Sequence, residues 1–379
     1  MKMNNQIWMM TSALPAMSLP QIIEENRKIG AQGLEICVFR RDGSRQDHVA
    51  THMDYENFSY DKASDYIDQL NSASLKFSIG AYENLIGGDL KERVQNQNHL
   101  LKLIRMAHLM GGDENGINVG TFVGFNHELG VTEGGFEKNL QEYKKVFTPI
   151  IKYAEDLGVT VVYENCPMEG WRSSGYYSTF NNLPGVLAAR KLMYALIPSP
   201  AHGETYDPSH DVWQHTDPVE VIKHSDMKRI KTIHIKSTRF LKNAASVYWG
   251  GMYANQMISP DLAAEAGVPV PAHDWDRQNY EAMLPGFGGT DSMDWRALVE
   301  ILMEKKFKGA FSIENEASLS KGTGNSAAIV QGFQAGIYNL MPMIWPLTET
   351  GYQYDNSNDK PLSNSFTKDV PIVTMSDLS

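Results

Sequence analysis

The chain has little of what marks several protein classes. Among its 379 residues only two are cysteines, Cys37 and Cys166, so a disulfide framework is absent and a reducing compartment is expected. Both lie beside apolar runs and are predicted to be buried thiols. Basic residues number 34 against 45 acidic ones, and the net charge of −11 disfavours a nucleic-acid-binding protein. No apolar run has membrane length and no secretory signal is evident, so we expect a soluble, cytoplasmic protein.

Glycine-rich phosphate-binding motifs are also missing. No GxGxxG follows the first predicted strand, which argues against two doubly wound nucleotide-binding domains. No glycine-rich phosphate cradle is present elsewhere, which favours an unphosphorylated substrate. The length fits one large domain or two ordinary ones, with a composition normal for a globular protein.

Short β-like runs alternate with helix-like runs along most of the chain. The eight predicted strands are residues 7–11, 34–39, 75–81, 116–121, 159–163, 202–206, 230–235 and 310–313. The predicted helices are residues 19–29, 60–73, 90–110, 136–157, 183–196, 219–225 and 295–305. Several junctions, such as Leu157-Gly158-Val159, end a helix at glycine and lead into a strand. This pattern predicts an α/β fold with a parallel sheet, most simply a single (β/α)8 TIM barrel, with two doubly wound domains as the alternative.

Two segments exceed the minimal barrel pattern. Residues 239–289 form a long insertion after the seventh strand, and their aromatic content favours an ordered lid over the catalytic face. Residues 346–379 form a polar C-terminal extension that wraps the surface, contacts a partner or remains flexible. The barrel domain itself is predicted to be residues 1–345.

Four side chains lie at the ends of four separate predicted strands: Glu164, Asp207, His234 and Glu314. Functional groups of barrel enzymes come from the C-terminal ends of strands. An acid after a strand also commonly caps the next helix, so each residue alone is a weak signal. Three carboxylates and one imidazole at matching strand ends nevertheless predict a single divalent-metal site. The oxygen-rich set suits Mn²⁺, Mg²⁺ or Co²⁺ better than a structural Zn²⁺ site, although zinc stays open.

Further polar residues follow the same strands. His210, three residues after the aspartate, is predicted to contact substrate, to support or join the ligands, or to cap a helix. Lys236 shares a strand face with the histidine ligand, so it either neutralises a developing oxyanion or lies at the barrel rim. Glu316 shares a face with Glu314 and either replaces it as a ligand or forms hydrogen bonds beside it.

Weaker candidates for substrate binding lie in loops. Trp171 and Arg172 follow the fifth strand, where the indole either stacks on a sugar or packs within the loop. His52 follows the second strand and is either a substrate contact or an ordinary loop residue. His127 follows the fourth strand and is either a proton donor that contacts the substrate or an ordinary loop residue. Asp217, directly before a proline, is predicted to be a structural helix cap.

Several motifs carry a family resemblance. They include THMDYENF at 51–58, VGTFVG at 119–124, YENCPM at 163–168, YDPSH at 206–210 and HIKST at 234–238. These stretches resemble the xylose isomerase-like barrel superfamily, specifically the sugar phosphate isomerase/epimerase group. The resemblance implies one divalent metal held by the four strand-end residues, proton exchange by Glu164 and Glu314, and substrate contact by His210. Barrels of this group often associate, so a homo-oligomer is expected by analogy. The sequence departs from the group at Phe125, at Ser237 and in the long insertion, which leaves the substrate open.

These observations predict a metal-dependent isomerase or epimerase of a keto-sugar or cyclitol that works through an enediolate, with proton transfer between two glutamates. The alternative is a dehydratase or lyase that eliminates a β leaving group from a keto-sugar or 3-keto-glycoside. An abasic-site endonuclease shares the barrel but needs several zinc ions and a basic groove. A non-catalytic sugar-binding or scaffold protein would not need the intact ligand set.

Overall fold

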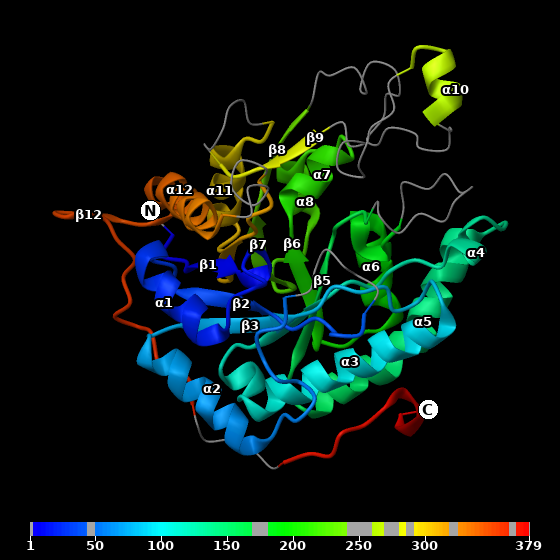
Figure 1. Cartoon of the computed structure of the whole chain (residues 1–379), viewed down its shortest axis with the longest axis horizontal. Coiled ribbons are helices and arrows are strands. Elements are labelled where there is room, and N and C mark those ends of the chain that lie inside the picture. Colours follow the sequence, from blue (N-terminus) through cyan, green and yellow to red (C-terminus); the bar gives the residue numbers. More distant parts are fainter. Residues whose placement is uncertain are drawn as a thin grey trace.

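Eight parallel strands close into a barrel in the order β1-β10-β7-β6-β5-β4-β3-β2 (Figure 1). The computed structural model describes residues 3–43, 50–168, 181–240, 260–268, 280–285, 292–317, 325–363 and 369–378. The barrel strands are β1 (Ile7–Met10), β2 (Gly33–Cys37), β3 (Lys76–Gly80), β4 (Asn118–Thr121), β5 (Thr160–Glu164), β6 (His202–Tyr206), β7 (Ile230–Ile235) and β10 (Ala310–Ile313). The predicted (β/α)8 barrel is therefore confirmed, and each predicted strand end lies within two residues of the observed one.

Most helices surround the barrel, whereas α10 (Pro260–Glu265) stands apart from it in Figure 1. The other described helices are α1 (Leu19–Ile29), α2 (Tyr60–Ser72), α3 (Leu90–Leu109), α4 (His127–Gly130), α5 (Gly135–Asp156), α6 (Leu187–Leu196), α7 (Pro208–Trp213), α8 (Pro218–His224), α11 (Trp295–Glu304) and α12 (Ser326–Ile344). None of the helices in the described ranges combines the length and apolar character needed to cross a membrane.

The local sequence explains where the main elements begin and end. Ser59, Asp89 and Asp294 each accept a hydrogen bond from a first-turn backbone N–H and so start α2, α3 and α11. Gly30 ends α1 in the left-handed region at φ 86°, which glycine adopts without a steric penalty. Asp217 caps α8 by accepting from the Val219 N–H at 2.9 Å, as predicted.

The core lies inside the barrel and between the barrel and its helices. All residues of β2, β5 and β6 are buried, because one face of each strand fills the barrel and the other is covered by helices. The two cysteines are buried free thiols, as expected. Burial raises the pKa of Cys37, which makes this thiol a poor nucleophile.

Helix α12 was not predicted from the sequence. The helical pattern of its sequence is interrupted by Gly336 and, near the end of the helix, by Pro342. In a sequence, glycine and proline usually indicate a break in a helix. A Cβ at Gly336 would lie 3.1 Å from Cδ1 of Ile313, so the glycine allows α12 to pack closely on β10. A tertiary contact therefore explains a residue that argues against a helix in the sequence.

The insertion begins as a direct continuation of β7. Strand β8 (Ser237–Phe240) pairs antiparallel with β9 (Tyr280–Met283), and this hairpin rises beyond the barrel strands in Figure 1. Most of the lid predicted at 239–289 lies outside the described residues. Both strands of the hairpin lie within the described residues, and they border the candidate metal centre.

The C-terminal extension runs along the outside of the barrel (Figure 1). It starts with the short hairpin of β11 (Leu347–Thr348) and β12 (Gly351–Tyr352). Asn71 then exchanges two hydrogen bonds with the backbone of Leu362, and Arg105 pairs with Asp369 at 2.7 Å. Of the predicted alternatives, the described part of the extension wraps the surface of its own chain.

Candidate metal centre

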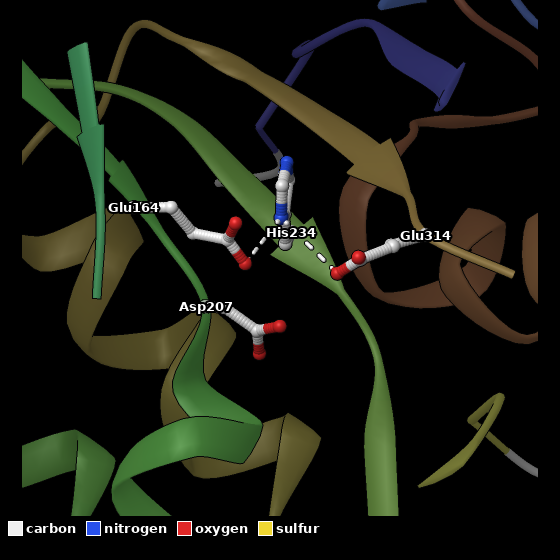
Figure 2. A group of neighbouring side chains, drawn as sticks. All are labelled: Glu164, Asp207, His234 and Glu314. Carbon is white, nitrogen blue, oxygen red and sulfur yellow. Dashed lines mark ion pairs between the residues drawn. The ribbon is translucent and has the colours of Figure 1, made fainter. Parts of the chain in front are cut away.

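The structure brings the four predicted ligands together. Glu164 ends β5, Asp207 follows β6, His234 lies near the end of β7 and Glu314 follows β10. These are four successive neighbours in the barrel, so their C-terminal ends meet at one rim. Each residue offers one ligand atom, and these atoms all lie within 4.8 Å of one another. Figure 2 shows the imidazole between the two glutamates, with all four side chains pointing toward a common centre.

His234 faces a carboxylate on each side. Its Nδ1 lies 3.4 Å from Oε1 of Glu164 and 3.3 Å from Oε2 of Glu314. Burial lowers the pKa of His234, but the surrounding glutamates raise it by more, so its pKa lies well above the usual value. The carboxylates around His234 therefore favour positive charge at this position of the site.

Lys236 supplies a buried positive charge on the other side of the cluster. Its Nζ lies 2.6 Å from Oε2 of Glu314, 3.0 Å from Oδ2 of Asp207 and 3.1 Å from Oε2 of Glu316. The side chain is only 1% exposed, so Lys236 points inward as strand alternation predicts and is not a rim lysine. One ammonium group cannot balance this many buried carboxylates, and a divalent cation would.

The donor set fits such a cation. Three carboxylates and one imidazole are the ligands that Mn²⁺, Mg²⁺ or Co²⁺ accept, and Zn²⁺ remains compatible. Among the described residues, the buried Nδ1 of His234 makes no hydrogen bond, which leaves it available for a ligand bond. Burial raises the pKa of Glu314; the ammonium of Lys236 opposes this rise, and the nearby carboxylates of Glu316 and Glu164 add to it.

Asp207 and His210 are linked by the short helix α7. Oδ1 of Asp207 caps α7 by accepting from the Ser209 N–H at 2.8 Å, while Oδ2 faces the cluster. The capping and ligand interpretations of this aspartate are therefore compatible. One turn later, Nε2 of His210 lies 3.1 Å from Oε1 of Glu164 and 3.2 Å from Oδ2 of Asp207. Burial raises the pKa of Glu164, but the neighbouring imidazoles of His210 and His234 lower it below its usual range.

Sequence reasoning assigned no role to Glu35 of β2. Nε2 of His234 donates to this carboxylate, with distances of 3.2 and 3.0 Å to its two oxygens. Tyr82 also donates to Glu35 from its hydroxyl group. This arrangement directs the other imidazole nitrogen toward the ligand cluster. The available signal was an acidic residue within an apolar strand.

Glu35→Gln is expected to weaken Mn²⁺ binding about 10- to 100-fold. The Glu35 carboxylate orients His234 and makes its imidazole more basic, and the substitution removes both effects. Calorimetric titration of the metal-stripped protein with Mn²⁺ measures this. Tyr82→Phe is the control, since it removes a donor to Glu35 but leaves the contact with His234. Equal affinities for Glu35→Gln and the unmodified protein would contradict the assigned role.

The predicted substrate-binding residues are less closely connected to the cluster. Both ring nitrogens of His52 face backbone oxygens, those of Met17 at 2.9 Å and Thr11 at 3.2 Å. His127 pairs with Oδ1 of Asn181 at 2.6 Å and lines a polar cavity of about 610 Å³. Within the described ranges, neither histidine forms a hydrogen bond or ion pair with the four ligands. Trp171 and Arg172 lie outside the described residues.

The fold and this cluster define a class: a TIM-barrel protein with a candidate metal centre at the C-terminal ends of its strands. The family model of the xylose isomerase-like TIM barrel matches residues 23–334. The chain therefore belongs to the xylose isomerase-like TIM barrel family. A comparison with curated protein sequences finds no match.

Solved structures with the same fold have several different activities. The chain is similar to a D-psicose 3-epimerase, with a TM-score of 0.56 and 11% identity, over 89% of this chain and 99% of that one. The IOLI protein with a bound zinc atom also has a TM-score of 0.56, with 15% identity, over 89% and 99% of the two chains. The probable 3-DHS dehydratase of Bacillus anthracis has a TM-score of 0.54 and 15% identity, over 88% and 98%. At these identities the likeness establishes the fold alone.

Proposed function

We propose that the protein is a divalent-metal-dependent isomerase or epimerase of a keto-sugar or cyclitol. One observation carries the proposal: Glu164 and Glu314 come from the two outer strands of the four that supply ligands, on opposite sides of His234 (Figure 2). A substrate between two carboxylates presents one face of its reacting carbon to each. This is the geometry that proton removal and return require.

Glu164, Asp207, His234 and Glu314 would hold the metal. When bound, a divalent ion supplies Lewis-acid polarisation of the substrate carbonyl and so lowers the pKa of the C–H group on the neighbouring carbon. Mn²⁺, Mg²⁺, Co²⁺ and Zn²⁺ are all compatible with this set of side chains.

The side chains of the site divide the remaining work. One glutamate removes the proton α to the carbonyl, and the other returns a proton to the opposite face or to the adjacent carbon. The Lys236 ammonium, 2.6 Å from Glu314, donates a hydrogen bond toward the developing negative oxygen. His210, held 3.1 Å from Glu164, is placed to bind a substrate hydroxyl.

Elimination is the second candidate, because it shares the same first step. The ammonium of Lys236 beside Glu314 provides a proton donor that a departing β substituent would need. The similar fold of a probable dehydratase is compatible with this alternative. Elimination changes the mass of the sugar product, whereas isomerisation and epimerisation conserve it.

The test is metal analysis followed by solvent-deuterium exchange. We expect about one equivalent of divalent metal per chain and incorporation of deuterium from D₂O into a ketose, an inosose or a 3-keto-glycoside. Treatment with EDTA should abolish exchange, and Mn²⁺ should restore it. Exchange that persists in fully metal-free protein would overturn the proposal. Mass spectrometry of the product decides between isomerisation and elimination.

A further inference from the structure

Two aromatic rings connect the candidate metal centre to the hairpin of the insertion. Trp213 is the last residue of α7, and Tyr280 is the first residue of β9. Their rings stack with centroids 4.0 Å apart and an interplanar angle of 22°. Both side chains are buried, and they form a small apolar cluster separate from the barrel core. The pair therefore acts locally, at the junction between the site and the insertion.

The indole of Trp213 also faces two polar residues of the site. Its ring lies edge-on to His210, with centroids 4.2 Å apart at 74°. The Nζ of Lys236 lies 5.3 Å from the indole centroid. The indole N–H donates to Oγ1 of Thr238 on β8 at 2.8 Å, which fixes the ring against the hairpin.

Lys236 has a flexible four-carbon side chain that ends among several acidic neighbours. Carboxylates of Asp207, Glu314 and Glu316 all lie within 3.1 Å of Nζ, and the Trp213 indole adds a contact of a different kind to the same ammonium group. An indole face attracts a cation, and the attraction is strongest where water is excluded. The ring therefore limits where the ammonium can lie.

We propose that Trp213 is a positioning residue through which the β8–β9 hairpin holds the Lys236 ammonium against Glu314. Trp213 is 4% exposed, and it acts on the reaction through Lys236 and His210. The positioning itself is a structural property of the protein. Its effect on rate rests on the proposed function.

Nuclear magnetic resonance tests the positioning without reference to activity. In the full-length protein labelled with ¹⁵N-lysine and supplied with Mg²⁺, the buried Lys236 ammonium protons should be shifted upfield by the indole ring current. Their signal is assigned by its loss in Lys236→Met. Trp213→Leu should move the signal downfield, and an unmoved signal would overturn the proposal. If that variant does not fold, Tyr280→Leu, which removes only the stacking partner, is expected to broaden or shift the same signal.

Trp295→Leu is the matched control. Trp295 is also buried and donates its indole N–H to the hairpin, at Oγ of Ser237, but the described residues show no contact between its ring and the Lys236 ammonium. Its replacement should lower the melting temperature at least as much as Trp213→Leu while leaving the lysine signal in place. A shift of similar size in both variants would indicate general loosening and contradict a specific role for Trp213.

Kinetics tests the consequence. At saturating metal and substrate, Trp213→Leu should lower the rate of deuterium exchange about tenfold, with KM and the Mn²⁺ affinity changed by less than about threefold. An effect confined to KM would contradict positioning of Lys236 for proton transfer. If the unmodified protein exchanges no proton with any sugar tested, the proposed function fails, and the lysine resonance still decides the positioning.

Discussion

Replacing either Glu164 or Glu314 with glutamine is expected to lower the rate of proton exchange by about 10²- to 10⁴-fold, the usual contribution of a general acid or base. Glutamine keeps the size of the side chain and one ligand oxygen but cannot accept the substrate proton. The measurement is the rate of deuterium incorporation from D₂O at saturating Mn²⁺ and substrate. The loss should remain when the metal concentration is raised, because the missing function is proton transfer.

Asp207→Asn separates the loss of a ligand from the loss of a base. Asp207 belongs to the same cluster, but it lies between the two outer ligand strands and is hydrogen-bonded to the start of α7. Its replacement should weaken metal binding, and raising the Mn²⁺ concentration should restore much of the exchange. If added Mn²⁺ restores the exchange rate equally in the Glu164, Glu314 and Asp207 variants, the two glutamates act only as ligands.

The two glutamate variants should also differ from each other. When the base that serves one epimer is replaced, that epimer should retain its proton. The other epimer should still exchange its proton for deuterium, without inversion, because its own base is intact. Both epimers of one substrate, incubated in D₂O with each variant, therefore identify which glutamate serves which face. Identical behaviour of both epimers in both variants would contradict a two-base mechanism.

Much of the barrel could be predicted because its signals are local. Each strand is a short apolar run bounded by turn residues, and the period of the seven predicted helices is visible within their own segments. The convergence of the four candidate ligands could be predicted because parallel strands in a barrel direct their C-terminal ends to one rim. Asp207 and His234 are thus brought together by a rule of topology that needs no knowledge of packing.

Other parts depend on contacts across the fold and carry no local signal. The hydrogen bond between Glu35 and His234 joins strands that are far apart in sequence and not neighbours in the barrel. The stack of Trp213 on Tyr280 requires the insertion to return to α7, which no periodic pattern predicts. No sequence pattern singles out Arg190 either, because its contribution to stability comes entirely from its burial in the folded chain.

Arg190→Met is expected to lower the free energy of unfolding by about 3–5 kcal/mol, because it leaves buried carboxylates without their cation. The Arg190 side chain is fully buried on α6, and its Nε lies 3.0 Å from Oε2 of Glu204 on β6. Urea unfolding at pH 8, with the midpoint and the slope both fitted, measures the loss. Arg27→Met, which breaks an exposed pair with Glu24, should cost less than about 1 kcal/mol.

The pH dependence of this loss provides a second, independent test. Burial raises the pKa of the nearby Asp211 to about 6, while Arg190 opposes the rise. Removing the guanidinium should therefore raise that pKa further, so the folded variant holds this proton over a wider pH range than the unmodified protein. The destabilisation by Arg190→Met should then be smaller at pH 5, where Asp211 is already largely neutral, and should grow as the pH rises through 6.

Adding Glu204→Gln to Arg190→Met should recover part of the lost stability, because it removes one uncompensated charge. A double variant no more stable than Arg190→Met, together with a loss that does not vary with pH, would assign the effect to packing of the arginine side chain and not to its charge.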